Sequence, residues 1–442
     1  MLLHDQLQLT HELATPEHWT TIQQHLPEAW LERALTDSGI ATLRRRRLPL
    51  QQAIWLVLGM ALLRDRSIVE VAERLDLALP GATCPVSSAL VQARQRLGSE
   101  PLERLFRLTA QYWTLPELEH SRCQGWRVVA LDGVVWRTPD TAENRAAFGG
   151  QRNRPGHHSP FPNVRSACLM DVRSRLLLDA TLDAYDVSEY RLAARLLPSL
   201  PEQSILLIDK GFFSASLLWP LQHRDHRHWL IPARAGLRGT LIARYGHGDG
   251  RLRMPVSPAA HRKDPTLPAT WEARVVTRRL PNGDECAVLT TLDDPEAWPA
   301  DVVFELYRER WEIELAFAEL KNELLHCAMT LRSQTAQGVR QELWATLVMY
   351  NLVRLEMTRI AEEAGVEPIR ISFITALHYI IDEWLWSTSA APGTIPKKLR
   401  AMRRNIQRFV LPRRRSTRRY PRAVRMSKTR YPIMKNATQS LN

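Results

Sequence analysis

Three acidic residues in separate parts of the chain have the types and settings needed to bind divalent metal ions. Asp132 and Asp209 each end a short apolar run that predicts a β-strand, and a glycine follows each closely. Glu314 lies in a segment without glycine or proline, which predicts a helix. Carboxylate oxygens are ligands that Mg²⁺ prefers, and two such ions can activate a water or a 3′-hydroxyl for in-line phosphoryl transfer. These acids therefore point to metal-dependent phosphoryl transfer.

The helix around Glu314 is predicted to cover residues 302–325. At about 100° per residue, one side of it carries four polar residues: Tyr307, Arg310, Glu314 and Lys321. The other side carries five acids, which we interpret as solvated: Glu305, Glu309, Glu312, Glu319 and Glu323. A lone carboxylate on the apolar side of a helix is costly to bury unless it is paired or metal-bound. The helix alone leaves two interpretations open, a metal ligand or a buried Glu–Arg–Lys ion-pair cluster.

The apolar runs around the two aspartates predict an α/β fold of the ribonuclease H-like kind. Strands are expected at residues 127–132, 164–170, 176–182 and 204–209, with a helix at 187–197. Parallel neighbouring strands would bring both aspartates to one edge of the sheet, where ligands collect. Other acids in this region fall in predicted turns or loops and are interpreted as structural or solvated: Asp140, Glu143, Asp171, Asp179, Asp183 and Asp186.

The changes of pattern along the chain predict five segments. These are a helical N-terminal DNA-binding domain (1–122), a first part of the catalytic domain (123–225), a β-rich insertion (226–300), a second catalytic part (301–390) and a basic C-terminal tail (391–442). The insertion contains a predicted hairpin at 271–292, because Asn282-Gly283 suits a type I′ turn.

The N-terminal segment weakly resembles a helix-turn-helix. Its second helix, over residues 87–97 and capped by Ser87, would present four side chains suited to base edges and phosphates: Gln92, Arg94, Gln95 and Arg96. The basic run at residues 44–47 precedes a helix expected to start at Pro49, and either grips phosphates or is simply solvated.

Composition favours an intracellular protein that binds a polyanion. The net charge is +13, and the residues from Leu411 onward contain ten Lys or Arg and no acid. Ribosomal association or solubility is the alternative reading of such a tail. The five cysteines are scattered without a C-x-x-C pair, which argues against zinc or disulfides. The longest apolar run is about half a membrane span, and no signal-peptide pattern begins the sequence, so no membrane partner is expected.

Several motifs of this sequence resemble those of a known protein family. The chain is similar to bacterial insertion-sequence DDE transposases of the insertion-sequence-four family, over nearly its whole length. Leu131-Asp132-Gly133 and the segment 208–212 match the first two acids of the family, and Tyr307, Arg310, Glu314 and Lys321 match its Y-R-E-K spacing. Segments 43–50 and 92–98 also look family-like. Lys210-Gly211-Phe212 stands where Arg-Gly-Tyr is commoner.

The resemblance implies cut-and-paste transposition at terminal inverted repeats. It makes Asp132, Asp209 and Glu314 the triad that binds two Mg²⁺ ions, with Mn²⁺ able to substitute. Tyr307, Arg310 and Lys321 would hold phosphates of the DNA end. Trp311 would stack on DNA or lie buried, and these two readings stay open.

The resemblance also implies partners and a route. The partners are the double-stranded element ends and the target DNA, with a homodimer in a synaptic complex. The expected location is the bacterial cytoplasm, at the nucleoid. Excision in this group can pass through a DNA hairpin with a flipped base stacked on an aromatic residue. Trp229, Trp271 and Trp298 are candidates for that role, with core packing as the alternative for each.

Two other functions would use the same fold. One is a DNA-binding protein or repressor that has lost catalysis, which the presence of all three acids and their Y-R-K companions argues against. The other is a stand-alone nuclease, which would not need the N-terminal helical module or the basic tail.

Overall fold

The computed structural model describes residues 22, 25–40, 48–77, 84–113, 122–150, 152–154, 157–222, 227–234, 236–279, 285–326, 330–387 and 392–413. Residues 1–410 form one unit and those from Leu411 onward a second. The basic run at 44–47, the Asn282-Gly283 turn and nearly all of the tail after Leu411 lie outside the described residues. Their predicted roles therefore stay predictions.

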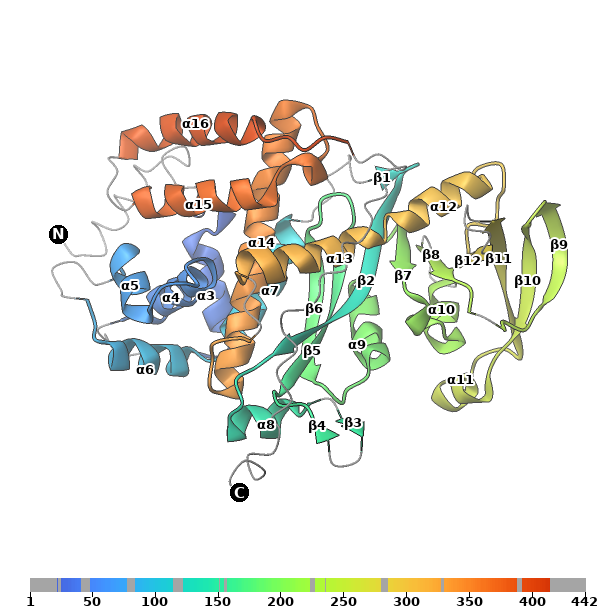
Figure 1. The fold of residues 1–442 in the computed structure, drawn as a ribbon, viewed down its shortest axis with the longest axis horizontal. Coiled ribbons are helices and arrows are strands. Elements are labelled where there is room, and N and C mark those ends of the chain that lie inside the picture. Colours follow the sequence, from blue (N-terminus) through green and yellow to red (C-terminus); the bar gives the residue numbers. More distant parts are fainter. Residues whose placement is uncertain are drawn as a thin grey trace, which may run out of the picture. The chain divides into compact units, whose positions relative to one another are not determined.

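A ten-stranded mixed sheet forms the centre of the first unit (Figure 1). Its first part consists of β2 (Trp126–Arg137), β5 (Asn163–Asp171), β6 (Leu177–Ala184) and β7 (Ser204–Ile208), with β1 (Arg122–Cys123) beside β2. Helix α9 (Glu189–Leu196) lies between β6 and β7 in sequence. β2 pairs antiparallel with β5 and parallel with β7, so the order is β6-β5-β2-β7. This order confirms the predicted ribonuclease H-like fold.

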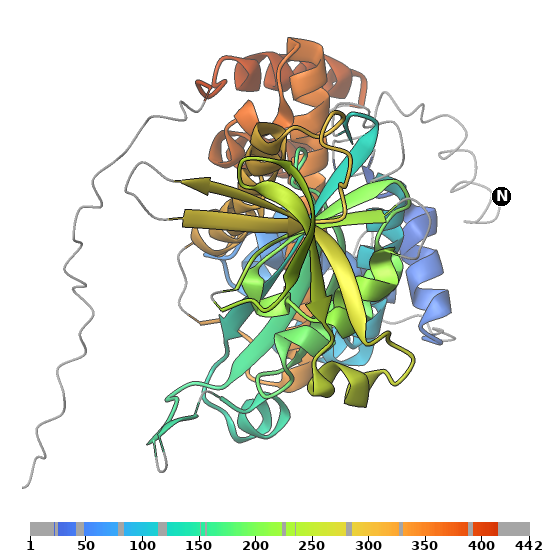
Figure 2. The ribbon, with the colours of Figure 1, turned by 90° about the vertical axis from the view of Figure 1, so that its right-hand side faces the viewer.

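The β-rich segment extends the same sheet. Its strands are β8 (Arg227–Pro232), β9 (Thr240–Gly246), β10 (Asp249–Pro255), β11 (Thr270–Arg279) and β12 (Glu285–Thr290). β8 pairs parallel with β7 and antiparallel with β12, which joins the two parts of the sheet. The predicted hairpin is confirmed by the antiparallel pairing of β11 with β12. Figure 2 shows how the successive strands rotate relative to one another, as strand twist requires.

The two faces of the sheet belong to two apolar clusters. Val129 and Leu131 of β2 pack in the cluster that includes α9 and α10 (Ala215–Gln222). Val128, Ala130 and Val134 pack in the larger cluster, which includes the later helices. Because successive strand side chains point to opposite faces, Asp132 lies on the same face as Ala130 and Val134.

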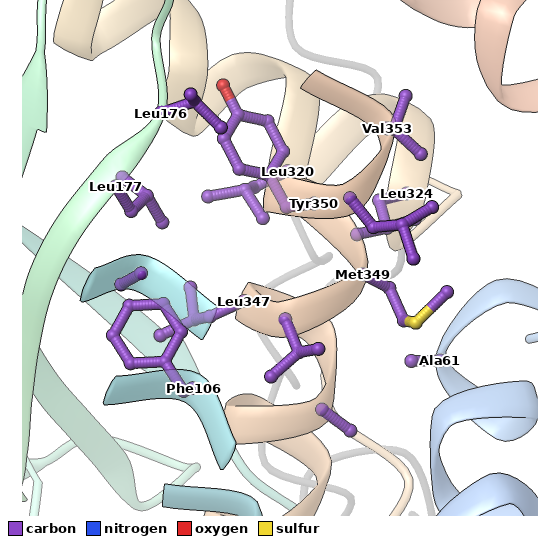
Figure 3. Close-up of a cluster of buried hydrophobic side chains, with 14 of the residues drawn as sticks. Ala61, Phe106, Leu176, Leu177, Leu320, Leu324, Leu347, Met349, Tyr350 and Val353 are labelled. Atoms are coloured by element: carbon purple, nitrogen blue, oxygen red, sulfur yellow. The ribbon is translucent and has the colours of Figure 1, made fainter. Parts of the chain in front are cut away.

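Helices from both ends of the sequence share the larger cluster. The N-terminal ones are α3 (Glu28–Asp37), α4 (Leu50–Leu62), α5 (Ile68–Arg74), α6 (Ser87–Leu97) and α7 (Glu100–Trp113). The later ones are α14 (Ala336–Ala364), α15 (Phe373–Ser387) and α16 (Ile395–Gln407). α14 is buried over most of its length and packs against α4, α7 and β6 (Figure 3). None of the helices described here combines the length and apolar character that crossing a bilayer requires.

The helix predicted over residues 302–325 is interrupted, so that prediction is wrong in detail. It consists of α12 (Ala300–Arg308), α13 (Trp311–Ala318) and a π-helical turn, η5 (Glu319–Leu324). At the break, the backbone N–H groups of Glu309 and Arg310 donate to the carbonyls three residues earlier, each at 3.1 Å. Glu309 there forms an ion pair with Arg173, at 3.0 Å. Helix propensity is uniform across this segment, so contacts with other elements decide where the helix is broken.

Candidate active site

Asp132 and Asp209 occupy matching positions on two neighbouring parallel strands. Leu131 of β2 is in register with Ile208 of β7, and the aspartates are the next residue of each strand. Asp209 follows the end of β7 and accepts a hydrogen bond of 3.4 Å from the N–H of Gly211. Asp132, in contrast, does not end its strand, since β2 continues to Arg137. The prediction of two strand-end acids is therefore correct for Asp209 and wrong for Asp132.

The carboxyl of Asp132 is poorly solvated and lies near two other acids. Its side chain is 21% exposed. The pKa of Asp132 is raised to about 6, chiefly by burial, and the negative charges of Glu314 and Asp209 also raise it. A hydrogen bond from the N–H of Gly133 and the positive charge of Arg310 act in the opposite direction and lower it. The charges of the other two predicted acids thus reach Asp132.

Gly133 lies close to a side chain on the opposite face of β2 from Asp132. An added Cβ at this position would lie 3.0 Å from Cδ of Glu189, at the start of α9. A larger residue after Asp132 would therefore require the Glu189 side chain to move by a few tenths of an ångström.

Arg310 connects the acid on β2 with the acid on α13. Its Nη2 donates a hydrogen bond of 2.8 Å to Oε1 of Glu314, and its Nη1 lies 3.6 Å from Oδ2 of Asp132. The guanidinium is buried, and its Nε has no hydrogen-bond partner among the described residues. Glu314 is 40% exposed, so the fully buried ion-pair cluster is not what forms.

Tyr307 belongs to the same group. Burial raises the pKa of Tyr307 to about 12, while nearby Arg310 lowers it and the charge of Asp209 raises it. The predicted common face of Tyr307, Arg310 and Glu314 is thus present despite the break at residues 309 and 310.

Lys321 and Trp311 lie at the margins of this group. Lys321, in η5, has its Nζ 5.3 Å from the ring centre of Trp136, which is on the Asp132 face of β2 but four residues further on. Burial lowers the pKa of Lys321, and Arg137 lowers it further. Trp311 is 55% exposed and lies under the Arg310 guanidinium, at 5.2 Å, so it is not a core residue.

The tryptophans considered for base stacking are packed in the interior. Trp229, Trp271 and Trp298 are all buried. Core packing, the alternative left open for each, is what this structure shows.

The donor set suits a hard divalent cation by its chemistry. Asp132, Asp209 and Glu314 offer only carboxylate oxygens, and the buried guanidinium of Arg310 faces two of them, Asp132 and Glu314. Within the described ranges, no three His, Cys, Asp or Glu side chains lie close enough to hold a metal ion. Arg310 pairs with two of the three acids in the arrangement seen here, in the manner of a counter-ion.

Three of the five acids on the other side of the helix, Glu309, Glu312 and Glu319, form ion pairs with other elements, so the prediction that they are simply solvated is wrong for these three. Glu312 and Glu319 both form ion pairs with Arg175, and Glu319 also pairs with Arg354 of α14. The hydroxyl of Tyr350 donates to Glu319 at 3.1 Å. Glu305 keeps an exposed pair with Arg308, so the prediction of a solvated acid is confirmed for Glu305. Sequence reasoning missed Arg175 and Arg354, because their partners are far away along the chain.

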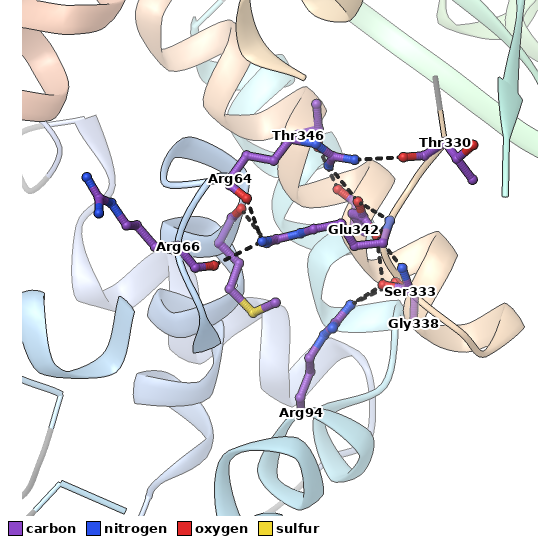
Figure 4. A network of polar contacts seen from close by, with 10 residues as sticks. Arg64, Arg66, Arg94, Thr330, Ser333, Gly338, Glu342 and Thr346 are labelled. Atoms are coloured by element: carbon purple, nitrogen blue, oxygen red, sulfur yellow. Dashed lines mark hydrogen bonds and ion pairs between the residues drawn. The ribbon is translucent and has the colours of Figure 1, made fainter. Parts of the chain in front are cut away.

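Arg94 is a structural residue, not the predicted reader of DNA. It donates to Oε1 of Gln341, to Oγ of Ser333 at 2.7 Å and to the carbonyl of Gly338 at 3.0 Å (Figure 4). Burial lowers the pKa of Arg94. Ser87 does not cap α6, whose N-cap is Val86. The other three predicted DNA contacts, Gln92, Gln95 and Arg96, are exposed.

The competing acids have structural partners, as interpreted from the sequence. Asp171 pairs with Arg127 at 3.2 Å, Asp179 with Arg107 at 2.9 Å and Asp183 with Arg195 at 2.5 Å. Asp171, the last residue of β5, and Asp179 and Asp183, within β6, lie in strands, so the prediction that they fall in turns or loops is wrong.

Two family models agree with the resemblance seen in the sequence. The family model of the insertion element 4 transposase N-terminal region matches residues 16–107, and that of the transposase DDE domain matches residues 124–352. Among solved structures, the piggyBac transposase synaptic complex with hairpin DNA aligns with a TM-score of 0.45 and 10% identity, covering 90% of this chain and 85% of that one.

Two relatives from Escherichia coli K12 are similar in sequence. The transposase InsG for insertion sequence element IS4 is 39% identical over 428 residues, which are 96% of this chain and 95% of InsG. The putative transposase InsZ is 37% identical over 246 residues, which are 54% of this chain and 81% of InsZ. The chain therefore belongs to the IS4 family of insertion-sequence transposases, and its DDE domain makes it an enzyme that cleaves and transfers DNA.

Proposed function

We propose that this transposase cuts and joins the ends of its insertion sequence with Mg²⁺ ions held by Asp132, Asp209 and Glu314. The observation that carries the proposal is the matching position of Asp132 and Asp209 on β2 and β7, with Glu314 close enough to raise the pKa of Asp132. When bound, two such ions would polarise the phosphoryl oxygens and activate the attacking water or 3′-hydroxyl. Mn²⁺ shares the preference for oxygen ligands and would substitute.

The residues around the acids would hold the DNA end. Arg310 has donors directed at two carboxylates and an Nε without a partner among the described residues, so a phosphate oxygen can take up its remaining capacity. Tyr307 supplies a hydroxyl that stays protonated at neutral pH, because its pKa is raised to about 12. Trp311 offers an exposed ring on which a base can stack. Lys321 offers a cation beside Trp136, which lies further along β2 than Asp132.

The finer course of the reaction follows family membership. The substrate would be the terminal inverted repeats of the element, and the route cut-and-paste through a DNA hairpin. A homodimer would hold two ends in a synaptic complex before transfer to target DNA, in the cytoplasm at the nucleoid. The five-segment division of the chain belongs to the same proposal.

The test is cleavage of a labelled duplex that carries one element end. Asp132→Ala, Asp209→Ala and Glu314→Gln should each slow Mg²⁺-dependent cleavage by more than about a hundredfold. Mutating a residue that only supports a metal ligand typically costs about 10- to 100-fold, and losing a ligand itself should cost more. Binding of the end should be retained. Glu305→Gln, an exposed glutamate on α12, is the matched control and should cleave normally. Normal cleavage by Glu314→Gln would refute the triad, and a hairpin product on a denaturing gel would test the route.

A further inference from the structure

Positive charge is concentrated at the C-terminal end of the sequence. After Glu383 there are sixteen Lys or Arg and no acid. Since the chain has 60 basic and 47 acidic side chains, residues 1–383 hold 44 basic against 47 acidic ones. The whole excess of positive charge therefore follows Glu383, and α16 is the described helix that carries part of it.

α16 has an apolar side that is fully used and a cationic side that is free. Ile395, Leu399, Met402 and Ile406 are buried, and the helix packs against α14 and α15 (Figure 1). Four exposed cations follow one another at spacings of three and four residues: Lys397, Arg400, Arg404 and Arg408. Such spacing keeps them on one side of a helix over roughly 16 Å.

These four cations differ from a fifth on the same helix. Arg403 pairs with Glu356 at 2.6 Å and with Glu363 at 3.0 Å. None of the other four forms an ion pair with any described residue, and α16 contains no acid that could provide one. The charge of this side is thus not compensated within the part of the unit that is described.

We propose that the exposed side of α16 binds the phosphate backbone of duplex DNA, at a place separate from the acids on β2 and α13. This inference rests on the proposed action on DNA. Phosphate contacts by Lys and Arg carry no base information, so the face suits DNA whose sequence varies, such as target or flanking DNA. A membrane surface fits less well, because a helix that binds lipid needs a free apolar side and that of α16 is buried.

The test is binding of the full chain to a duplex that lacks the element ends, measured by fluorescence anisotropy over a series of KCl concentrations. In Arg400→Ala/Arg404→Ala, affinity should fall and the slope of log K against log[KCl] should become shallower by about two. The matched control, Arg33→Ala/Arg104→Ala, removes two exposed arginines already paired with Asp37 and Glu100, and should keep the wild-type slope.

The outcomes separate this inference from the proposed function. An unchanged slope in Arg400→Ala/Arg404→Ala would overturn the α16 site, even if element ends are still cleaved. Reduced binding of this variant to anionic phospholipid vesicles, with an unchanged slope on DNA, would overturn it as well. Asp209→Ala should lose cleavage yet keep the wild-type slope, so a failure of the acid site leaves this measurement intact.

Discussion

Arg310, the N-cap residue of α13, donates a hydrogen bond of 2.8 Å to Glu314, one helical turn later in the same helix. The same guanidinium reaches toward Asp132 on β2. One cation thus holds acids from a strand and a helix near each other. A divalent ion carries twice that charge and accepts oxygen ligands directly, so the same acids provide an attractive site for it.

Asp132→Asn should make the metal-free protein more stable at pH 8. The pKa of Asp132 is raised from 3.8 to about 6, chiefly by burial. The folded state therefore binds the proton of the Asp132 carboxyl more tightly than the unfolded state does. The protonated carboxyl contributes stability at low pH, and this contribution is lost as pH rises from about 4 through 6. Removing the charge should raise the free energy of unfolding by roughly 1–3 kcal/mol at pH 8. Urea titrations at pH 8 and pH 4 measure this, and the gain should nearly vanish at pH 4.

Asp183→Asn is the control for that prediction, because its sign is opposite. Arg195 holds the pKa of Asp183 below its usual value, so this carboxylate stabilises the fold above the unfolded pKa. The variant should be slightly less stable at pH 8. A loss of stability in Asp132→Asn at pH 8 would show that the ionised carboxylate of Asp132 does not destabilise the folded state.

Arg310→Ala should weaken the complex with the element end and reduce its salt slope by about one, as expected when one phosphate contact is lost. It should also move the acidic limb of the cleavage pH profile upward, since the positive charge of Arg310 lowers the pKa of Asp132. Arg308→Ala removes an exposed arginine paired with Glu305 and should change neither. Equal behaviour of the two variants would exclude a specific role for Arg310.

Arg94→Ala should destabilise the fold without a selective loss of sequence preference. Arg94 donates three hydrogen bonds to Gln341, Ser333 and Gly338, which would be left without their partner. The expected loss is about 2–4 kcal/mol in the free energy of unfolding. Gln95→Ala, on the exposed side of the same helix, should cost less than about 0.5 kcal/mol. Thermal unfolding and binding to matched and scrambled ends decide between the two roles.

Glu319→Gln should be strongly destabilising. Its carboxylate accepts from Arg175, Arg354 and Tyr350, and Arg354 is buried. Removing one charge of a buried pair typically costs about 3–5 kcal/mol. Glu305→Gln breaks an exposed pair and should cost less than about 1 kcal/mol. Similar unfolding midpoints for the two variants would contradict the network.

The four strands of the first catalytic part and their order could be predicted from local pattern, whereas β8, β9 and β10 were not predicted. Apolar runs such as residues 164–170 and 204–209 predict strands. The predicted helix at 187–197, directly before the strand at 204–209, indicates a crossover connection to a parallel strand. The positions of Asp132 and Asp209 could be predicted on the same grounds, because register follows once the strands pair. The true length of β2 was not predicted, because Gly133 after Asp132 suggests a strand end, although Val134, Val135 and Trp136 are residues typical of strands.

The predictions that were wrong about side-chain surroundings and about the helix break have a common cause. Glu312, Glu319 and Arg94 look like surface residues by helical periodicity, yet each meets a partner far away in the sequence. Periodicity places a side chain on a face but does not say whether that face is covered by another charged element. The break at Glu309 and Arg310 has the same origin, since helix propensity alone favours an unbroken helix there.

The most direct test of the account is anomalous diffraction from crystals of the chain bound to an element end and soaked in Mn²⁺. The account predicts at least one anomalous peak with oxygens of Asp132 and Asp209 at about 2.1–2.4 Å, and Glu314 coordinating a Mn²⁺ ion at the same site. A structure in which Mn²⁺ binds elsewhere, or in which any of these three carboxylates stays outside coordination distance with DNA in place, would contradict it.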